Sequence, residues 1–282
     1  MKTIWIVYNG TLSGGSFLQQ RKSYARAAEK AGLHVREVTA EESVYIDEKP
    51  LFAIFADKDI YAAMSLENKG IRLFNSSECI RICDDKALTY IKLTAAGVPI
   101  PDTVIPPKIY GGSVNNAFCI SAAAKLGYPL IIKECFGSFG KQVYLAENET
   151  EMLEIKNKIG SAPFVFQRFV AKSAGTDIRV IVSGGRVIGA VKRYNTNDFR
   201  SNVENGGAVM HCAPSRFRDK LALAAANACG AAFAGVDLIE DDTGFKVCEV
   251  NSNFHFGGAQ PFVECDIADE IINDIIFYSL NK

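Results

Sequence analysis

Strand and helix patterns alternate along the first 80 residues, and this alternation limits the possible fold more than any other feature. The β-rich runs lie at Thr3–Tyr8, His34–Val38, Leu51–Ala56 and Ile71–Phe74, and the helical patterns at Phe17–Ala31 and Ile60–Asn68. Strands that alternate with helices at these lengths predict a small parallel sheet covered on both faces. We expect a compact α/β domain over residues 1–80.

The strand patterns in the rest of the chain follow one another as hairpins. A link is expected over Asn75–Asp85, followed by a helix over Lys86–Ala96. From Leu130 onward strands dominate, and Gly184-Gly185 between two β-rich runs is typical of a tight antiparallel turn. Further helices are expected at Ala117–Leu126, Thr150–Ile159, Arg216–Cys229 and Ile267–Tyr278. The pattern predicts an α+β region built on antiparallel sheets.

The composition limits the kinds of partner that the protein is expected to bind and the compartment in which it is expected to occur. The 282 residues carry 31 Lys and Arg against 32 Asp and Glu, and this balance argues against a general nucleic-acid binder, which needs excess positive charge. No apolar run approaches the roughly 20 residues of a membrane span, and the first strand is too short for a signal peptide. The eight cysteines form no Cys-x-x-Cys pair. We therefore expect reduced thiols, a cytoplasmic location and no membrane association.

One predicted hairpin concentrates oxygen ligands. Asp237 lies on its first strand, and Glu249 and Asn251 lie two residues apart on its second strand, hence on one face. Two carboxylates and an amide oxygen suit Mg²⁺, which prefers hard ligands and keeps positions for water and phosphate. The alternative is that Asp237 and Glu249 are ordinary surface residues of the two strands. The apolar neighbours of both acids favour the metal site.

A second pattern places a lysine before a glycine-rich loop. Lys133 ends the apolar run Leu130–Glu134, and Gly137-Ser138-Phe139-Gly140 follows. Glycines allow backbone N–H groups to approach phosphate oxygens, and a lysine on a strand adds a fixed positive charge. The loop is not a Walker A sequence, because Cys135 stands where the first glycine is required. A plain hairpin loop is the alternative.

Other segments are less specific. Arg193 and Arg200 flank a polar loop that ends at Asn202, and their guanidinium groups could hold a transferring phosphate or be merely solvated. Gly14-Gly15-Ser16 lacks the Gly-x-Gly-x-x-Gly spacing of a dinucleotide site. His255 lies four residues beyond Asn251, so it is the one histidine that we place at the candidate active site, with a packing role as the alternative.

Taken together, these segments resemble the ATP-grasp superfamily, and specifically the RimK-like α-L-glutamate ligases and the related ligases of lysine biosynthesis. The resemblance is strongest from Phe166 to the end and weakest over the first 80 residues. It is carried by Gln167-Arg168-Phe169, Gly175-Thr-Asp177-Ile-Arg179, Asp198-Phe-Arg200-Ser-Asn202, Gly235-Val-Asp237 and Cys248-Glu249-Val-Asn251, and more weakly by Asp84-Asp85-Lys86 and Lys133. The order and spacing of these segments match the family.

The resemblance implies a fold and an activity. The fold is an ATP-grasp fold with a small parallel α/β domain at residues 1–80, a central lobe at 81–166 and a C-terminal lobe at 167–282. The activity is ATP- and Mg²⁺-dependent joining of a carboxylate to an amine through an acylphosphate, with Mn²⁺ as an alternative ion. The partners would be a small-molecule or peptide carboxylate and an amino acid such as glutamate, and a homo-oligomer stays open.

The resemblance also implies roles for individual residues. Lys86 and Lys133 would hold ATP phosphates under a lid that contains Gly137, Ser138 and Gly140. Gln167, Arg168 and Phe169 would form the hinge at the adenine, with Asp177 near the ribose. Asp237, Glu249 and Asn251 would bind Mg²⁺, and Arg193, Arg200 and Asn202 would act at the transferring phosphate. Arg179, Ser252, Asn253 and His255 would contact the substrate.

Two departures from the family pattern leave the substrates open. After Asn251 the family commonly has a small residue and then Pro-Gly, whereas this chain has Ser252-Asn253-Phe254-His255-Phe256. The insertion at 106–116 has no assigned role. Two alternative hypotheses are that the protein is an ATP-binding scaffold without catalysis and that it is a dinucleotide-dependent oxidoreductase. Under the ligase reading, Asp237→Ala and Glu249→Ala should each abolish turnover and leave folding nearly intact.

Overall fold

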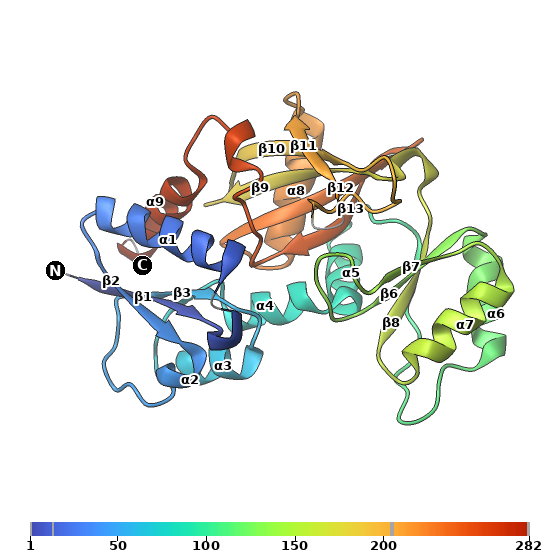
Figure 1. Cartoon of the computed structure of the whole chain (residues 1–282), viewed down its shortest axis with the longest axis horizontal. Helices are drawn as coiled ribbons and strands as arrows, with labels where there is room; N and C mark the ends of the chain where they lie inside the picture. Colours follow the sequence, from blue (N-terminus) through green and yellow to red (C-terminus); the bar gives the residue numbers. More distant parts are fainter. Residues whose placement is uncertain (1, 13, 204–205, 281–282) are drawn as a thin grey trace.

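Three β-sheets follow one another along the chain (Figure 1). The structure, a computed structural model, describes residues 2–12, 14–203 and 206–280. The first sheet is parallel and the other two are antiparallel. The predicted combination of a parallel α/β region with an antiparallel α+β region is therefore confirmed.

The N-terminal sheet has the strand order β2-β1-β3-β4. Its elements are β1 (Thr3–Tyr8), α1 (Gly15–Lys30), β2 (His34–Thr39), α2 (Ala40–Ser43), β3 (Ala53–Ala56), α3 (Ile60–Asn68) and β4 (Leu73–Phe74). Side chains of β1 alternate between the two faces. Ile4 and Ile6 share a core with α1, whereas Trp5 and Val7 share another with α3. The sheet is thus covered on both faces, as predicted.

The central sheet has the order β5-β8-β6-β7 and a core of its own. Its elements are β5 (Thr103–Val104), α6 (Asn116–Leu126), β6 (Leu130–Glu134), β7 (Val143–Ala146), α7 (Glu149–Ile159) and β8 (Phe164–Arg168). The glycine-rich loop predicted from the sequence joins β6 to β7. The 106–116 insertion is fastened by buried Lys156 on α7, which donates hydrogen bonds to Ser113, Asn116 and the carbonyl of Val114.

The C-terminal sheet has the order β11-β10-β9-β12-β13 and carries α8 on one face. Its elements are β9 (Thr176–Ser183), β10 (Arg186–Tyr194), β11 (Ala208–His211), α8 (Arg216–Ala228), β12 (Phe233–Asp241) and β13 (Gly244–Asn251). Gly184 and Gly185 both adopt positive φ, 57° and 75°, in the β9–β10 turn, as the hairpin prediction requires. The last helix, α9 (Ile267–Leu280), returns to pack beside α1 (Figure 1).

The predicted link over Asn75–Asp85 is wrong, because most of it forms a helix. Helix α4 (Ser77–Asp84) begins where the Ser76 hydroxyl accepts a hydrogen bond from Cys79 N–H, and it ends directly before α5 (Lys86–Ala95). Its apolar side chains are buried at i, i+3 and i+4 spacing. The expected domain boundary at 80/81 falls inside α4 and the one at 166/167 inside β8. That division stays a prediction.

Two further observations concern the cysteines and the helices. All eight cysteines are free thiols, and five of them are buried. None of the helices in the described part of the chain combines the length and apolar character that crossing a bilayer requires.

Candidate active site

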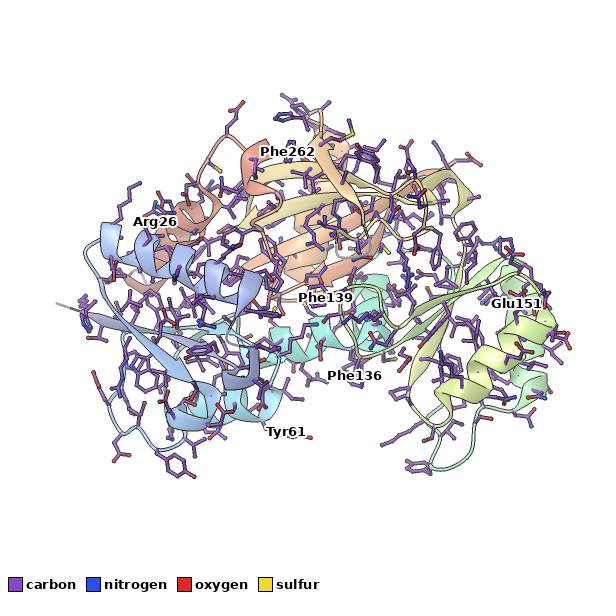
Figure 2. All side chains as sticks on the ribbon, viewed as in Figure 1. Arg26, Tyr61, Phe136, Phe139, Glu151 and Phe262 are labelled. Carbon is purple, nitrogen blue, oxygen red and sulfur yellow. The ribbon has the colours of Figure 1, made fainter. Side chains whose placement is uncertain are left out.

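A cavity of about 830 Å³ is lined by all three sheets, by α1 and by the β6–β7 loop. This volume suits a small-molecule site. The residues of the glycine-rich loop, with Phe136 and Phe139 among them, lie near the middle of the molecule (Figure 2). Apart from Ser252, every site residue predicted from the sequence lines this cavity. Ser252 is buried, and its carbonyl oxygen accepts a hydrogen bond from Asn75.

The floor of the cavity is a network of two arginines and two aspartates. Cross-strand pairing sets Arg179 on β9 directly opposite Asp237 on β12, and Asp177 on β9 opposite Arg193 on β10. Arg179 donates two hydrogen bonds of 2.7 Å to the Asp237 carboxylate. Arg193 donates to Asp177 and lies 2.9 Å from Asp237 Oδ2. Neighbouring strands therefore bring four predicted site residues into one buried ion-pair cluster.

Charge pairing decides the ionisation state of this cluster. Burial would raise the pKa of Asp237, but the Arg179 and Arg193 guanidinium groups hold it below its usual value. Burial would likewise lower the pKa of Arg193, yet Asp237 and Asp177 raise it. Asp237 and Arg193 are therefore both charged at neutral pH.

Glu249 and Asn251 extend the cluster along β13. Glu249 pairs in register with Asp237 across the hairpin, and Lys86 Nζ lies 3.8 Å from its carboxylate. The Asn251 amide lies 3.3 Å from Asp237 Oδ2. Asp237, Glu249 and Asn251 thus converge on the cavity with two carboxylates and one amide, a donor set that fits Mg²⁺. In the described part of the chain no three His, Cys, Asp or Glu side chains gather to hold a metal, so the amide is essential to this set.

Lys133 on β6 is held in position by Tyr90, which also contacts β13. Its ammonium donates to the Tyr90 hydroxyl at 3.2 Å, and that hydroxyl donates to the Cys248 carbonyl at 2.8 Å. Burial raises the pKa of Tyr90, so the phenol stays protonated and keeps this donor role. Tyr90 therefore fixes Lys133 relative to the strand that carries Glu249. Glu134, the next residue along β6, accepts a hydrogen bond from the Tyr144 hydroxyl.

Three cations hold the β6–β7 loop. Lys86 Nζ donates to the Gly137 carbonyl at 3.2 Å, Lys58 Nζ to Ser138 Oγ at 3.0 Å and Arg200 Nη1 to the Gly140 carbonyl at 2.9 Å. These cations come from α5, from the end of β3 and from the loop after β10. The cavity roof is therefore fastened by the same basic groups that could bind phosphate.

Aromatic rings close one end of the roof. The Phe139 ring is stacked on His255 with centroids 5.9 Å apart, and His255 packs edge-on against Phe17 at 4.5 Å. The packing role that we kept as the alternative for His255 is thus present, alongside its position in the cavity wall. His34 and His211 are exposed.

The residues of the predicted hinge segment make both buried contacts and surface contacts. Gln167 is buried and donates to the Thr103 hydroxyl, whereas Arg168 forms an ion pair with Asp102 at the surface. Phe169 packs against Phe199. Asn202 and Asn253 line the cavity, and Asn253 Oδ1 lies 3.5 Å from the Gln20 amide on α1.

Four further residues escaped the sequence analysis. Asp57 and Lys58 directly follow β3 and line the cavity, whereas Tyr90 on α5 and Asn75 after β4 lie outside its lining. The Asn75 side chain makes hydrogen bonds to the backbone of Ala232, Phe233 and Ser252, and so ties the base of β12 to the end of β13. A usable signal existed for Asp57, because polar residues directly after buried parallel strands gather at one sheet edge.

Fold and cavity together define a protein with a small-molecule site between three sheets, and comparison with known proteins identifies its family. The RimK-like ATP-grasp domain matches residues 83–275. The chain therefore belongs to the RimK-like ATP-grasp family, as the sequence motifs predicted. D-alanine–D-alanine ligase from Bacillus anthracis has the same fold, with a TM-score of 0.78, 17% identity and coverage of 99% of this chain and 98% of that chain.

Two curated human proteins are similar in sequence. Beta-citrylglutamate synthase B is 36% identical over 82% of this chain and 60% of its own length. N-acetylaspartylglutamate synthase A is 37% identical over 79% of this chain and 57% of its own length. The chain thus spans about three fifths of the length of these relatives.

Proposed function

We propose that the protein is an ATP-dependent carboxylate–amine ligase that joins an amino acid to a small-molecule or peptide carboxylate through an acylphosphate. The observation that carries the proposal is one cavity in which Lys86, Lys133 and Arg200 face Glu249 and Asn251, in a chain of the RimK-like family. Both human relatives are named for products that contain glutamate. L-Glutamate is therefore the first candidate for the amino acid.

In this proposal the basic residues bind ATP. Lys86 and Lys133 hold the phosphates, and the loop with Gly137, Ser138 and Gly140 covers them. Gln167, Arg168 and Phe169 border the adenine, with Asp177 on the ribose side. ATP would replace the loop oxygens that now accept hydrogen bonds from Lys86 and Arg200.

Asp237, Glu249 and Asn251 would hold Mg²⁺, or Mn²⁺ in its place. The ion supplies positive charge to the phosphate oxygens during transfer. Arg193 and Arg179 neutralise the charge of Asp237. Of the two carboxylates proposed as metal ligands, Glu249 therefore has the weaker competing ion pair, with Lys86 Nζ at 3.8 Å. Arg200 and Asn202 would stabilise the transferring phosphate.

The roof protects the acylphosphate. Phosphoryl transfer requires positioning and charge neutralisation more than a protein nucleophile. Exclusion of water by the β6–β7 loop limits hydrolysis before the amine attacks. Asn253 and His255 lie beyond the loop tip and border the space for the carboxylate substrate. The free thiols agree with a reducing compartment, which supports a cytoplasmic enzyme.

The test is ADP release with Mg-ATP, L-glutamate and either citrate or N-acetyl-L-aspartate, the acids named in the relatives' products. We expect ADP and a new amide in equal amounts, and hydroxamate when hydroxylamine replaces the amino acid. A Lys133→Met variant should release no ADP, whereas Lys125→Met on the exposed face of α6 should behave as wild type. Saturable ATP binding without ADP release across a wider panel of carboxylates would instead favour the scaffold alternative.

A further inference from the structure

Asp57 differs from the other acids of the cavity in having no basic partner. The cavity wall contains four carboxylates, on Asp57, Asp177, Asp237 and Glu249. Asp177 and Asp237 pair with arginines and Glu249 lies near Lys86. Asp57 accepts hydrogen bonds only from the Asn9 amide at 3.2 Å and the Lys58 backbone N–H at 2.8 Å, and no ion pair of Asp57 occurs among the residues that the structure describes.

This carboxylate is buried, with 7% of its surface exposed. Its neighbour Lys58 is the nearest basic residue in sequence, but that ammonium is engaged by Asp84 at 2.7 Å and by Ser138. Burial raises the pKa of Asp57. An ionised carboxylate removed from water requires a compensating charge. The protein supplies none at this position, so a cationic group of a ligand would stabilise the ionised form of Asp57.

The position of Asp57 in the sheet is that of a ligand-binding residue. Strand order β2-β1-β3-β4 means that the chain leaves β1 toward one side for β2 and returns to the other side for β3. Ligands of parallel sheets bind at the carboxyl ends of strands at such a reversal. Asn9 follows β1 and Asp57 follows β3, so the hydrogen-bonded pair occupies this crevice.

The crevice opens into the same cavity as the phosphate-facing residues. Leu12, Ser16 and Phe17 line the same cavity as Asp57. Through Lys58 and Ser138 the crevice also contacts the roof that covers the phosphate side. A group bound at Asp57 would therefore lie in the space that the amine must cross to reach an acylphosphate.

We infer that Asp57, supported by Asn9, binds the ammonium group of the incoming amino acid. The inference rests on the proposed function, and it specifies that the amine enters on the side of the N-terminal sheet. Carboxylate substrates and ATP, which are anions, bind on the side of the basic residues. The separation of charges within one cavity gives each substrate a distinct position.

A binding experiment tests the inference without turnover. The common amino acids are added singly to the protein in Mg-ADP, and the shift of Tm gives the affinity of each. We expect at least one amino acid to bind the wild type, its N-acetyl form to bind poorly, and the Asp57→Asn variant to bind it roughly 10- to 100-fold more weakly. Asp242→Asn, in the exposed β12–β13 turn, is the matched control and should bind as wild type.

A kinetic experiment separates the two proposals. Asp57→Asn should raise the KM for the amino acid much more than it lowers the rate of hydroxamate formation from hydroxylamine. An amino-acid affinity that is unchanged in Asp57→Asn, equal binding of N-acetyl forms, or no binding by the wild type would overturn the ammonium site. Loss of hydroxamate and amide together would also overturn it, because Asp57 would then act before the amine. Binding that depends on Asp57 without any ADP release would retain the ammonium site and refute the ligase.

Discussion

Arg179, on the strand directly beside that of Asp237, donates two parallel hydrogen bonds of 2.7 Å to the Asp237 carboxylate. A planar guanidinium matches a carboxylate in this geometry better than any lysine could. Because Arg193 approaches the same carboxylate from β10, a candidate metal ligand also pairs with a buried arginine, Arg193, and a partly buried one, Arg179. The expectation that Asp237→Ala leaves folding nearly intact is therefore revised.

Asp237→Ala should destabilise the fold. It would leave the Arg193 side chain, 7% exposed, without its Asp237 partner, and breaking a buried pair in this way costs about 3–5 kcal/mol. Urea unfolding measures this loss, with Asp242→Ala on the exposed turn as the control. A loss below about 1 kcal/mol, the range of surface ion pairs, would show that solvent already screens the cluster.

The contribution of Asp237 should depend on pH. Its folded-state pKa is lowered, so its stabilising effect is complete above the unfolded value of about 3.9 and is lost as the pH falls through the folded value. The stability gap between wild type and Asp237→Asn should therefore be constant from pH 7 to about pH 5 and narrow below about pH 4. Urea titrations at pH 6.5 and pH 3 compare the two, and a gap as large at pH 3 as at pH 6.5 would contradict the assignment.

Tyr90→Phe should weaken ATP binding. The substitution removes the hydroxyl that joins Lys133 to the Cys248 carbonyl. One hydrogen bond contributes about 0.5–1.5 kcal/mol, so we expect the KM for ATP to rise roughly 2- to 10-fold. Tyr144→Phe is the matched control, because that hydroxyl bonds Glu134 on the other face of β6. Equal KM values in the two variants would mean that Lys133 holds its position without Tyr90.

Asn75→Ala should impair both stability and metal use. The Asn75 side chain satisfies the carbonyls of Phe233 and Ser252 and the N–H of Ala232. Leaving buried backbone groups unpaired costs about 1–3 kcal/mol each. We expect a lower free energy of unfolding and a higher Mg²⁺ concentration for half-maximal ADP release. Exposed Asn227→Ala should change neither, and a stability loss with an unchanged Mg²⁺ requirement would reduce Asn75 to a purely structural residue.

Lys58→Met should loosen the cavity roof. The ammonium of Lys58 joins Ser138 in the roof to Asp84 at the end of α4. Without it, chymotrypsin should cleave after Phe136 or Phe139 several-fold faster in the nucleotide-free protein, and saturating Mg-ATP should restore protection. Lys125→Met serves as the control. Cleavage at the wild-type rate would show that Lys86 and Arg200 hold the loop alone.

Periodicity and turn residues were sufficient for most of the secondary structure, because they are local signals. The bounds of β1, α3 and β6 agree with those expected from the sequence. Helix α4 was missed because its eight residues include two cysteines, two acids and an arginine, which weaken the apolar pattern until a core is present to bury one face. Strand β11 was missed because its outer residues, Met210 and His211, are exposed.

Residues of the candidate site followed from family motifs, but their contacts did not. The pairing of Arg179 with Asp237 depends on the register of β9 against β12, and a shift of one residue would send every side chain to the opposite face. The contacts of Asn75 join residues more than 150 positions apart in sequence. No local pattern encodes such separations.

Helix α9 and helix α1 share one apolar core with the N-terminal sheet and with β9 and β12 of the C-terminal sheet. The central sheet, in contrast, buries its apolar side chains largely among themselves. This shared core couples the N-terminal sheet to the C-terminal sheet, whereas the central sheet meets the C-terminal one through Cys135 and Val165. Under the proposed function, a shift of the central sheet would move the nucleotide side of the cavity and leave the Asn9–Asp57 pair with the N-terminal sheet.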